Sequence, residues 1–251
     1  LFFHFCDHDA IDLYLVVIFL LFLKVLYFLN LIYQKIMCGI VGIYLKTKKF
    51  EKNLGKMLSG MLNNMESRGP DSAGFAIYKN EKKDIFKYSL CINDLNFKKF
   101  KKEISNKFKK IQLSQHADHV ILKTPIEPKI IIKIINEDFP QVSLVGYGHS
   151  IEIFKQVGNP KDVVKKFKLN SFSGTHGIGH TRMATESAIT TDGSHPYSTG
   201  RDECLVHNGS LSNHNNLRRE LIKKGNIFNS ENDTEVAAGY VSNSLSNKKS
   251  L

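Results

Sequence analysis

The chain has 251 residues, 42% of them hydrophobic, which is enough for one large domain or two small ones with a buried core. Its formal net charge of +11 comes mainly from lysine, without an arginine-rich patch, RNA-binding signature or zinc-finger spacing, so we expect no nucleic-acid partner. The four cysteines are scattered and form no CxxC pair, a pattern that favours reduced thiols in a cytoplasmic protein over a disulfide framework.

Residues 1–36 form a hydrophobic extension ahead of Met37, the first methionine of the chain. Within it, residues 11–33 have the hydropathy of a transmembrane helix, but the basic start and the small-residue cleavage site of a signal peptide are missing. Three interpretations stay open: a membrane anchor, a removable propeptide, or upstream sequence that is never translated. A chain that opens with Leu1 favours the third, so we predict that 1–36 are not part of the mature protein, which then has no membrane segment.

Hydrophobic periodicity and turn residues predict a series of strands and helices after Met37. In chain order these are a strand at 39–45, an amphipathic helix at 50–66, a turn at 68–71, strands at 74–78 and 85–90, a helix spanning 97–108, several strands within 118–157 that include 129–135 and 141–147, a helix at 160–169, strands at 178–182 and 203–207, a helix at 213–224 capped by Ser212 and ended by Gly225, and a helix from 233 to 245. Elements in this order indicate stacked sheets with helices outside them.

The segment 37–42, MCGIVG, carries the strongest chemical signal. Removal of Met37 would leave Cys38 with a thiol and a free α-amine on one residue. The amine can accept the proton of the thiol, which makes the residue a self-contained activated nucleophile. An amide nitrogen cannot accept that proton, so a membrane anchor ahead of Cys38 and this catalysis exclude each other.

Two segments join polar and charged residues in turns. The segment 68–74, RGPDSAG, is either a turn closed by a salt bridge or a place where Arg68 serves a site. In the segment 179–185, GHTRMAT, Arg182 ends a strand and can bind a carboxylate bidentately, or form a simple ion pair at the rim. His176 and His180 have a metal-like spacing, but the glycines between them argue against a shared helical face, so we predict no metal.

Two later segments offer hydrogen-bond donors and an acid. In 204–209, CLVHNG, the side-chain amide of Asn208 and the backbone N–H of Gly209 are the two donors that an oxyanion hole needs, although Asn-Gly also suits a hairpin turn. In 231–235, ENDTE, Asp233 lies at a helix start, where it caps the helix or binds a substrate ammonium group. The two roles of Asp233 are compatible.

Together and in this order, the five segments resemble the class-II glutamine amidotransferase domain, the N-terminal-nucleophile glutaminases. The resemblance spans 37–251 and implies an α+β fold, the four-layer αββα sandwich of the N-terminal-nucleophile hydrolases. Members of the family normally continue with further strands after the segment that reads NDTEV here, so we expect the domain to be incomplete at its C-terminus.

The resemblance implies a reaction and a role for each matching residue. The reaction is hydrolysis of L-glutamine to glutamate and ammonia through a Cys38 thioester. The implied roles are Cys38 as nucleophile with its α-amine as base, Asn208 and Gly209 as oxyanion hole, Arg182 on the glutamine α-carboxylate with Thr185 beside it, Asp233 on the α-ammonium, and Arg68 as organiser of the site near Cys38.

The subfamily most similar to this chain is the glutaminase subunit of N-methylglutamate synthase and of glutamate synthase-type systems. The hexosamine-forming relatives usually have tryptophan and tyrosine where this chain has Met183 and Pro70. The resemblance implies a separate synthase subunit that receives the ammonia, with flavin or iron–sulfur groups expected only on such partners and no cofactor in this chain. Two alternatives stay open: a catalytically silent interaction subunit, and a membrane-tethered protein that uses residues 11–33.

Overall fold

The computed structural model describes residues 24–25, 38–79, 83–184 and 188–247. The chain divides into two units, Leu1–Met37 and Cys38–Leu251, and the fold below is that of the second. The predicted extension 1–36, with its apolar segment 11–33, lies outside the described residues apart from Lys24 and Val25. None of the helices in the described ranges has the length and apolar character needed to cross a membrane.

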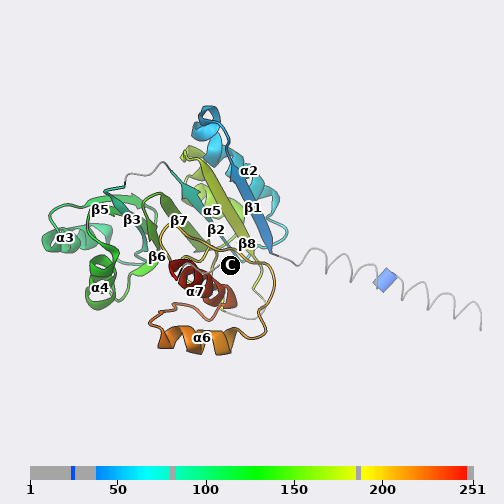
Figure 1. The fold of residues 1–251 in the computed structure, drawn as a ribbon. Helices are drawn as coiled ribbons and strands as arrows, with labels where there is room; N and C mark the ends of the chain where they lie inside the picture. The colour runs from blue at the N-terminus through cyan, green and yellow to red at the C-terminus, as the bar shows by residue number, and fades with distance from the viewer. Residues whose placement is uncertain (1–23, 26–37, 80–82, 185–187, 248–251) are drawn as a thin grey trace, which may run out of the picture. The chain divides into compact units, whose positions relative to one another are not determined.

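Two antiparallel four-stranded sheets form the centre of the second unit (Figure 1). The first has the order β1 (Gly39–Tyr44), β8 (His176–Arg182), β2 (Ser72–Tyr78) and β7 (Ile151–Val157). The second has the order β4 (Gln112–His116), β5 (His119–Thr124), β3 (Phe86–Cys91) and β6 (Ser143–Gly148). The backbone N–H of Ile153 in β7 donates to Ser89 Oγ in β3 over 2.9 Å, which ties one sheet to the other.

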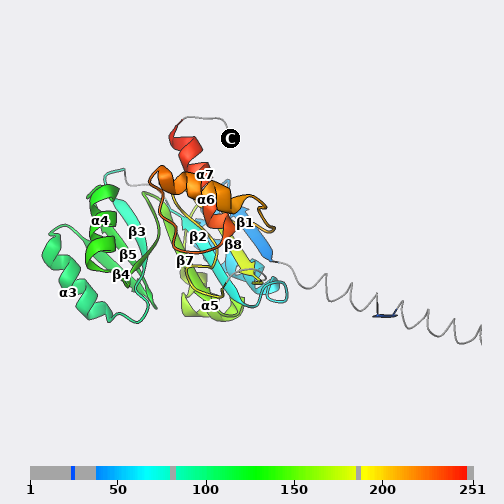
Figure 2. The same ribbon diagram turned by 90° about the horizontal axis from the view of Figure 1, so that it is seen from below.

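Helices cover both sheets. The first sheet shares a hydrophobic core with two helices, α2 (Leu54–Asn64) and α5 (Pro160–Lys166), and with the 3-10 turn η2 (Leu169–Ser171). A second 3-10 turn, η1 (Lys48–Asn53), leads into α2 and buries no residue. The second sheet packs against α3 (Phe97–Lys107) and α4 (Pro128–Asp138). The last two helices, α6 (His214–Lys223) and α7 (Asp233–Ser246), pack on each other, and Figure 2 shows them on the opposite side of the first sheet from α5.

This mixed architecture of two antiparallel sheets with outer helices is compatible with the expected α+β sandwich. Most predicted elements are confirmed with shifts of a few residues at their ends. They are β1, α2, β2, β3, α3, β6, α5, β8, α6 and α7, of which α2 begins only after a 3-10 turn within the predicted helix 50–66.

The predicted strand 129–135 is wrong, because these residues belong to α4. The run is rich in isoleucine, a residue typical of strands, but its buried side chains Ile131 and Ile135 are one helical turn apart, and Ile130 is exposed. Pro128 occupies the first turn of α4, a position where its missing N–H costs nothing.

The predicted strand 203–207 is also wrong. Leu205 forms only an isolated antiparallel bridge with Tyr197, in which each backbone N–H donates to the carbonyl of the other residue. Ser212 is not the cap of α6, since Asn213 occupies that position without a side-chain capping bond. Gly225 does end α6: it has a φ of +90°, and the N–H of the next residue, Asn226, returns to Leu221 O over 3.1 Å.

Two glycines on α2 provide a test of how closely this helix approaches η2. A Cβ at Gly55 would lie 2.1 Å from Leu169 O and 2.7 Å from Phe172 O, whereas a Cβ at Gly60 would meet nothing within 4 Å. We expect Gly55→Ala to lower the free energy of unfolding by about 2 kcal/mol or more through overpacking. Gly60→Ala should raise it by roughly 0.5–1 kcal/mol. Urea unfolding of both variants checks this, and equal changes at the two positions would contradict the packing of α2 on η2.

Candidate functional site

The start of β1 lies against the end of β8. The register pairs Gly39 with Thr181, and the N–H of Gly39 donates to Thr181 Oγ1 over 3.2 Å. Thr181 Oγ1 in turn donates to Met65 O over 3.3 Å. A Cβ at position 39 would lie 2.8 Å from Thr181 Oγ1, so only glycine allows this close approach. Cys38 therefore directly precedes β1 and lies beside the residues that follow β8.

The sulfur of Cys38 contacts the backbone of Met183. The Met183 N–H donates to Cys38 Sγ over 3.4 Å, and the thiol lies 3.7 Å from Met183 O. Cys38 is half-buried, so part of it is open to solvent. The backbone of Met183 therefore holds the sulfur of Cys38 beside the end of β8.

Asn208 lies next to Cys38. Its side-chain Nδ2 donates to Cys38 O over 3.1 Å, although 170 positions separate the two residues. The amide has a second N–H, and Asn208 is exposed, so this donor can face a substrate. Gly209 has a φ of +155°, and a Cβ there would lie 2.9 Å from His207 Nε2, so the turn requires glycine.

The loop after α2 holds the segment that follows β8. Asp71 Oδ2 accepts the N–H of Ala184 over 2.8 Å, and the N–H of Asp71 donates to Arg182 O over 3.1 Å. A Cβ at Gly69 would lie 2.5 Å from the carbonyl of Thr181, so this loop lies directly on β8. Asp71 is not among the site residues predicted from the sequence, although an acid in a Gly-Pro-Asp turn is a signal for such an anchor.

Arg182 is buried at the end of β8, with 4% of its surface exposed. Its Nη1 donates to Ala188 O over 3.1 Å, so the guanidinium group organises the loop that it was predicted to open into. The predicted neighbour Thr185 lies outside the described residues. Binding of a substrate carboxylate by Arg182 stays a prediction.

Asp233 is the first residue of α7 and joins this helix to the loop of Asn208. Its Oδ2 accepts the N–H of Leu211 over 2.7 Å, and its Oδ1 accepts the hydroxyl of Thr234 over 3.2 Å. Asn232 precedes it as the N-cap, with its side chain on the N–H of Thr234. Asp233 is half-buried and thus anchors the loop, while its predicted role on an ammonium group stays open.

Arg68 is half-buried in the turn that follows α2. Its backbone N–H donates to Met65 O over 3.0 Å, the same carbonyl that accepts Thr181 Oγ1. No hydrogen bond or ion pair of the Arg68 side chain occurs within the part of the chain that the structure describes. The turn therefore lies near the start of β1, whereas a contact of Arg68 with Cys38 stays a prediction.

The comparison with known proteins agrees with this geometry. Residues 169–243 match the glutamine amidotransferase domain. The glutamine amidotransferase-like protein GlxB of Rhizobium meliloti (strain 1021) is 46% identical over 218 residues, which cover 86% of this chain and 72% of GlxB. The chain belongs to the glutamine amidotransferase family.

Two further relatives support the same family. A protein of Methanothermobacter thermautotrophicus that has glutamine amidotransferase in its name is 33% identical over 232 residues, or 86% of this chain and 75% of that protein. The glutamine–fructose-6-phosphate aminotransferase of Methanococcus maripaludis is 38% identical over 103 residues, or 41% of this chain and 17% of that enzyme. The matched domain 169–243 contains Arg182, Asn208 and Asp233.

Two stacked histidines of this amidotransferase lie next to the segments that carry Asn208 and Asp233. The rings of His180 and His195 have centroids 3.9 Å apart and an interplanar angle of 21°. His180 Nε2–H donates to His207 O over 3.0 Å, and His195 Nε2 hydrogen-bonds with Thr234 Oγ1 at 3.0 Å. Since His180 is on β8, His207 precedes Asn208 and Thr234 is on α7, the stack connects three parts of the site. The sequence pattern relates His180 only to His176, and the stacking of His180 on His195 has no signal in the sequence.

Both histidines are neutral at pH 7. The pKa of His180 is lowered to about 4, chiefly by burial; the bond to His207 O opposes the shift, and the charge of Arg182 adds to it. Burial also holds the pKa of His195 well below its usual range, with His180 and Lys155 adding to the shift. A charged histidine in this stack would repel its neighbours, so the fold favours the uncharged rings.

One group of side chains within the described ranges could offer three metal ligands. Ligand atoms of Cys91, Asp118 and His119 lie within 4.8 Å of one another. Asp118 already contacts His119 Nδ1 at 3.0 Å and Lys166 Nζ at 2.9 Å. Burial raises the pKa of the Cys91 thiol to about 11, which keeps it protonated. These contacts disfavour a cation, and the absence of a metal stays a prediction.

The neutral stack predicts a stability that depends on pH. An unfolded histidine takes up a proton near pH 6.5, whereas His180 stays neutral down to about pH 4 in the folded protein. The free energy of unfolding should therefore fall as the pH drops from 6.5 to 4, by on the order of 3 kcal/mol from His180. Urea unfolding at several pH values checks this.

A matched pair of variants isolates this contribution from other groups that titrate in the same range. His180→Gln keeps an N–H for His207 O and should show a shallower pH slope than the unmodified protein. His214→Gln, on α6, removes a histidine outside the stack and should keep the original slope. An unchanged slope in His180→Gln would contradict the assignment.

Proposed function

We propose that this glutamine amidotransferase hydrolyses L-glutamine to glutamate and ammonia with Cys38 as the nucleophile. The observation that carries the proposal is the meeting of two hydrogen-bond donors at Cys38. The Met183 N–H lies 3.4 Å from the sulfur, and Asn208 Nδ2 lies 3.1 Å from the carbonyl oxygen of the same residue. A nucleophile beside an exposed amide donor is the arrangement that acyl transfer requires.

The proposed reaction has two halves. The thiol of Cys38 loses its proton to the α-amine freed by removal of Met37, and the sulfur attacks the side-chain amide carbon of glutamine. The Asn208 amide and the Gly209 N–H stabilise the oxyanion, the carbon–nitrogen bond breaks, and ammonia leaves with the proton returned by the ammonium group. Water then attacks the thioester, which releases glutamate and restores the thiol.

We propose further roles for the groups around Cys38. Arg182 and Thr185 bind the α-carboxylate of glutamine, Asp233 binds its α-ammonium group, and Arg68 organises the site near the new N-terminus. The supporting observation for Asp233 is its hydrogen bond to Leu211 N, which keeps the carboxylate beside the loop of Asn208. One cation and one anion suit the amino-acid end of the substrate.

Within the glutamine amidotransferase family, we propose that the chain belongs to class II and has the four-layer fold of the N-terminal-nucleophile hydrolases. We propose that ammonia passes to a separate synthase subunit of a glutamate synthase- or N-methylglutamate synthase-like complex. In this proposal the chain carries no cofactor, and any flavin or iron–sulfur group belongs to the partner. The support is the order of the five sequence segments, together with the similarity to GlxB.

The proposal predicts that glutamine hydrolysis requires a free N-terminus at Cys38. Protein expressed from Met37 should release glutamate and ammonia from glutamine after methionine removal, and Cys38→Ala should abolish the reaction. A chain that retains residues 1–36 should be inactive, because its Cys38 nitrogen is an amide. Ammonia release and mass spectrometry of the N-terminus check this.

A thiol that the site does not use serves as the control. Cys204 is half-buried and bonds to Tyr78 Oη at 3.3 Å, so Cys204→Ala should keep the activity. A diazoketone analogue of glutamine should add its mass to Cys38 and to no other cysteine. Hydrolysis by Cys38→Ala would overturn the proposal, and absence of both hydrolysis and labelling in correctly trimmed protein would favour the silent interaction subunit.

A second prediction concerns the oxyanion donor. Asn208→Ala should lower kcat by about two to three orders of magnitude with a small change in KM, because the lost donor acts on charge that develops in the transition state. Asn213→Ala, at the N-cap of α6 without a capping bond, is the matched control and should keep kcat. Steady-state kinetics decide, and a normal kcat for Asn208→Ala would rule out its role.

A further inference from the structure

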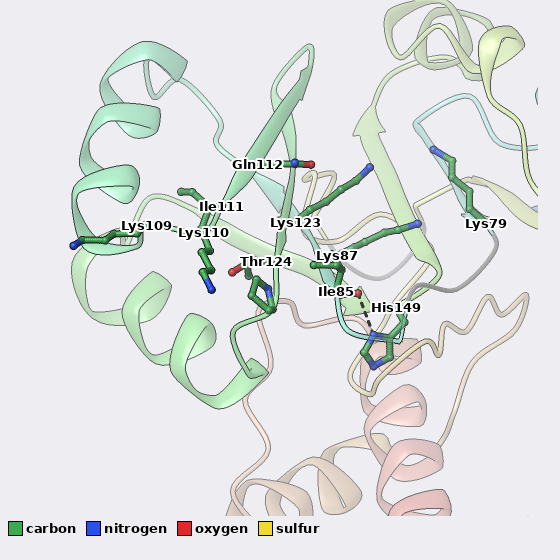
Figure 3. Close-up of a pocket in the computed structure, with 11 residues that line it drawn as sticks. Lys79, Ile85, Lys87, Lys109, Lys110, Ile111, Gln112, Lys123, Thr124 and His149 are labelled. Atoms are coloured by element: carbon green, nitrogen blue, oxygen red, sulfur yellow. Dashed lines mark hydrogen bonds between the residues drawn. The ribbon is translucent and has the colours of Figure 1, made fainter.

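A second concave site lies on the second sheet and shares none of its lining residues with the Cys38 site (Figure 3). The cavity has a volume of about 740 Å³, which falls within the range of roughly 300–1,000 Å³ that is typical of small-molecule sites. The described residues that line it include no aspartate or glutamate but five lysines, namely Lys79, Lys87, Lys109, Lys110 and Lys123.

Two of these lysines are direct cross-strand partners. The register of β3 and β5 pairs Lys87 with Lys123, and Figure 3 shows both side chains extending in the same direction, toward Lys79. Like charges opposite each other on neighbouring strands destabilise a sheet. This pair therefore destabilises the sheet least when a negative group lies between the two ammonium groups.

One carboxylate of the chain partly offsets this charge. Glu152 is 2% exposed and pairs with Lys79 and with Lys87, whose Nζ lies 3.2 Å from Glu152 Oε1. Although its burial acts in the opposite direction, the two lysines hold the pKa of Glu152 below its usual range. Lys123 forms no ion pair within the described ranges, so positive charge stays in excess at the cavity.

The lowered pKa of Lys87 reflects the same excess of positive charge. Burial is the largest cause that lowers it, and Lys79 and Lys123 lower it further, while Glu152 opposes the shift. Lys87 also donates to Ser150 O over 3.2 Å, which fixes its position. A bound anion would relieve the repulsion between these groups.

The remaining walls suit an organic ligand rather than a bare ion. Ile85, Ile111 and Pro125 supply apolar surface, and Thr124 is a neighbour of Lys123. His149 Nδ1–H donates to Ile85 O over 3.1 Å, which fixes the ring at the edge of the cavity. An apolar wall beside several ammonium groups matches a molecule with a carbon skeleton and a charged end.

We propose that this cavity binds a small molecule of the phosphate-ester or phosphoanhydride class that carries at least two negative charges. Lysine is a point-charge ligand for phosphate, and one dianionic group can contact several ammonium groups at once. The site is independent of the proposed glutaminase reaction. A nucleic acid fits less well, because single strands bind in extended grooves with aromatic stacking platforms, whereas this is a concave lysine pocket.

The test is a titration of the full chain with pyrophosphate at constant ionic strength, followed by calorimetry and thermal unfolding. We expect saturable binding of one pyrophosphate per chain and a Tm that rises with its concentration. The double variant Lys110→Gln/Lys123→Gln should weaken binding by about tenfold or more, because it removes two charges from the cavity while Lys87 and Glu152 stay paired.

The matched control removes two charges elsewhere. Lys101→Gln/Lys102→Gln, both exposed on α3 and outside the cavity, should keep the affinity within about twofold. Equal losses in the two double variants would show a general charge effect and overturn the proposal, as would a titration without saturation.

Two other ligands test the proposed ligand class. Citrate that binds more tightly than pyrophosphate would overturn the phosphate assignment in favour of a polycarboxylate. A short RNA that binds while pyrophosphate does not would overturn the small-molecule assignment. The same titration on Cys38→Ala should be unchanged, which separates this outcome from that of the glutaminase proposal.

Discussion

The close antiparallel pairing of β1 with β8 is the constraint on which the rest of the site depends. It sets Gly39 opposite Thr181, where a side chain at position 39 would collide with the threonine hydroxyl. Because the register is fixed, Cys38 becomes the residue just ahead of the ladder, with its sulfur at the N–H of Met183. A slip of one residue would turn each side chain of β1 to the other face of the sheet, so the position of the nucleophile follows from backbone pairing.

Carboxylates hold the loops of the site together, and each one acts on a segment other than its own. Asp71, from the turn after α2, accepts the N–H of Ala184 beyond β8. Asp233, from α7, accepts the N–H of Leu211 beyond Asn208. Since a backbone N–H without a partner costs free energy when water is excluded, loss of one segment leaves its neighbour unsatisfied. This interdependence explains why short polar segments that are distant in sequence occur as a set.

The sequence predicted local features well and non-local ones poorly. Strand β1 and helix α2 follow from the spacing of their apolar residues, and Gly225 ends α6 by a local backbone requirement. The isoleucine run of α4 reads as a strand on composition, and only its packing against the second sheet shows the helical period. Cys38 and Asn208 were predicted together through a resemblance, whereas the stack of His180 on His195 joins residues that no periodicity connects.

The arrangement of donors also limits which group can accept the proton of the Cys38 thiol. Within the described residues, the hydrogen-bond partners of Cys38 Sγ are the backbone groups of Met183, and no titratable side chain is among them. His180 Nε2–H donates to His207 O, His195 Nε2 hydrogen-bonds with Thr234 Oγ1, and burial keeps both rings neutral and poor as bases. In the proposed mechanism the proton acceptor is the amine that removal of Met37 would free, and this amine is bonded to the same Cα as the thiol side chain.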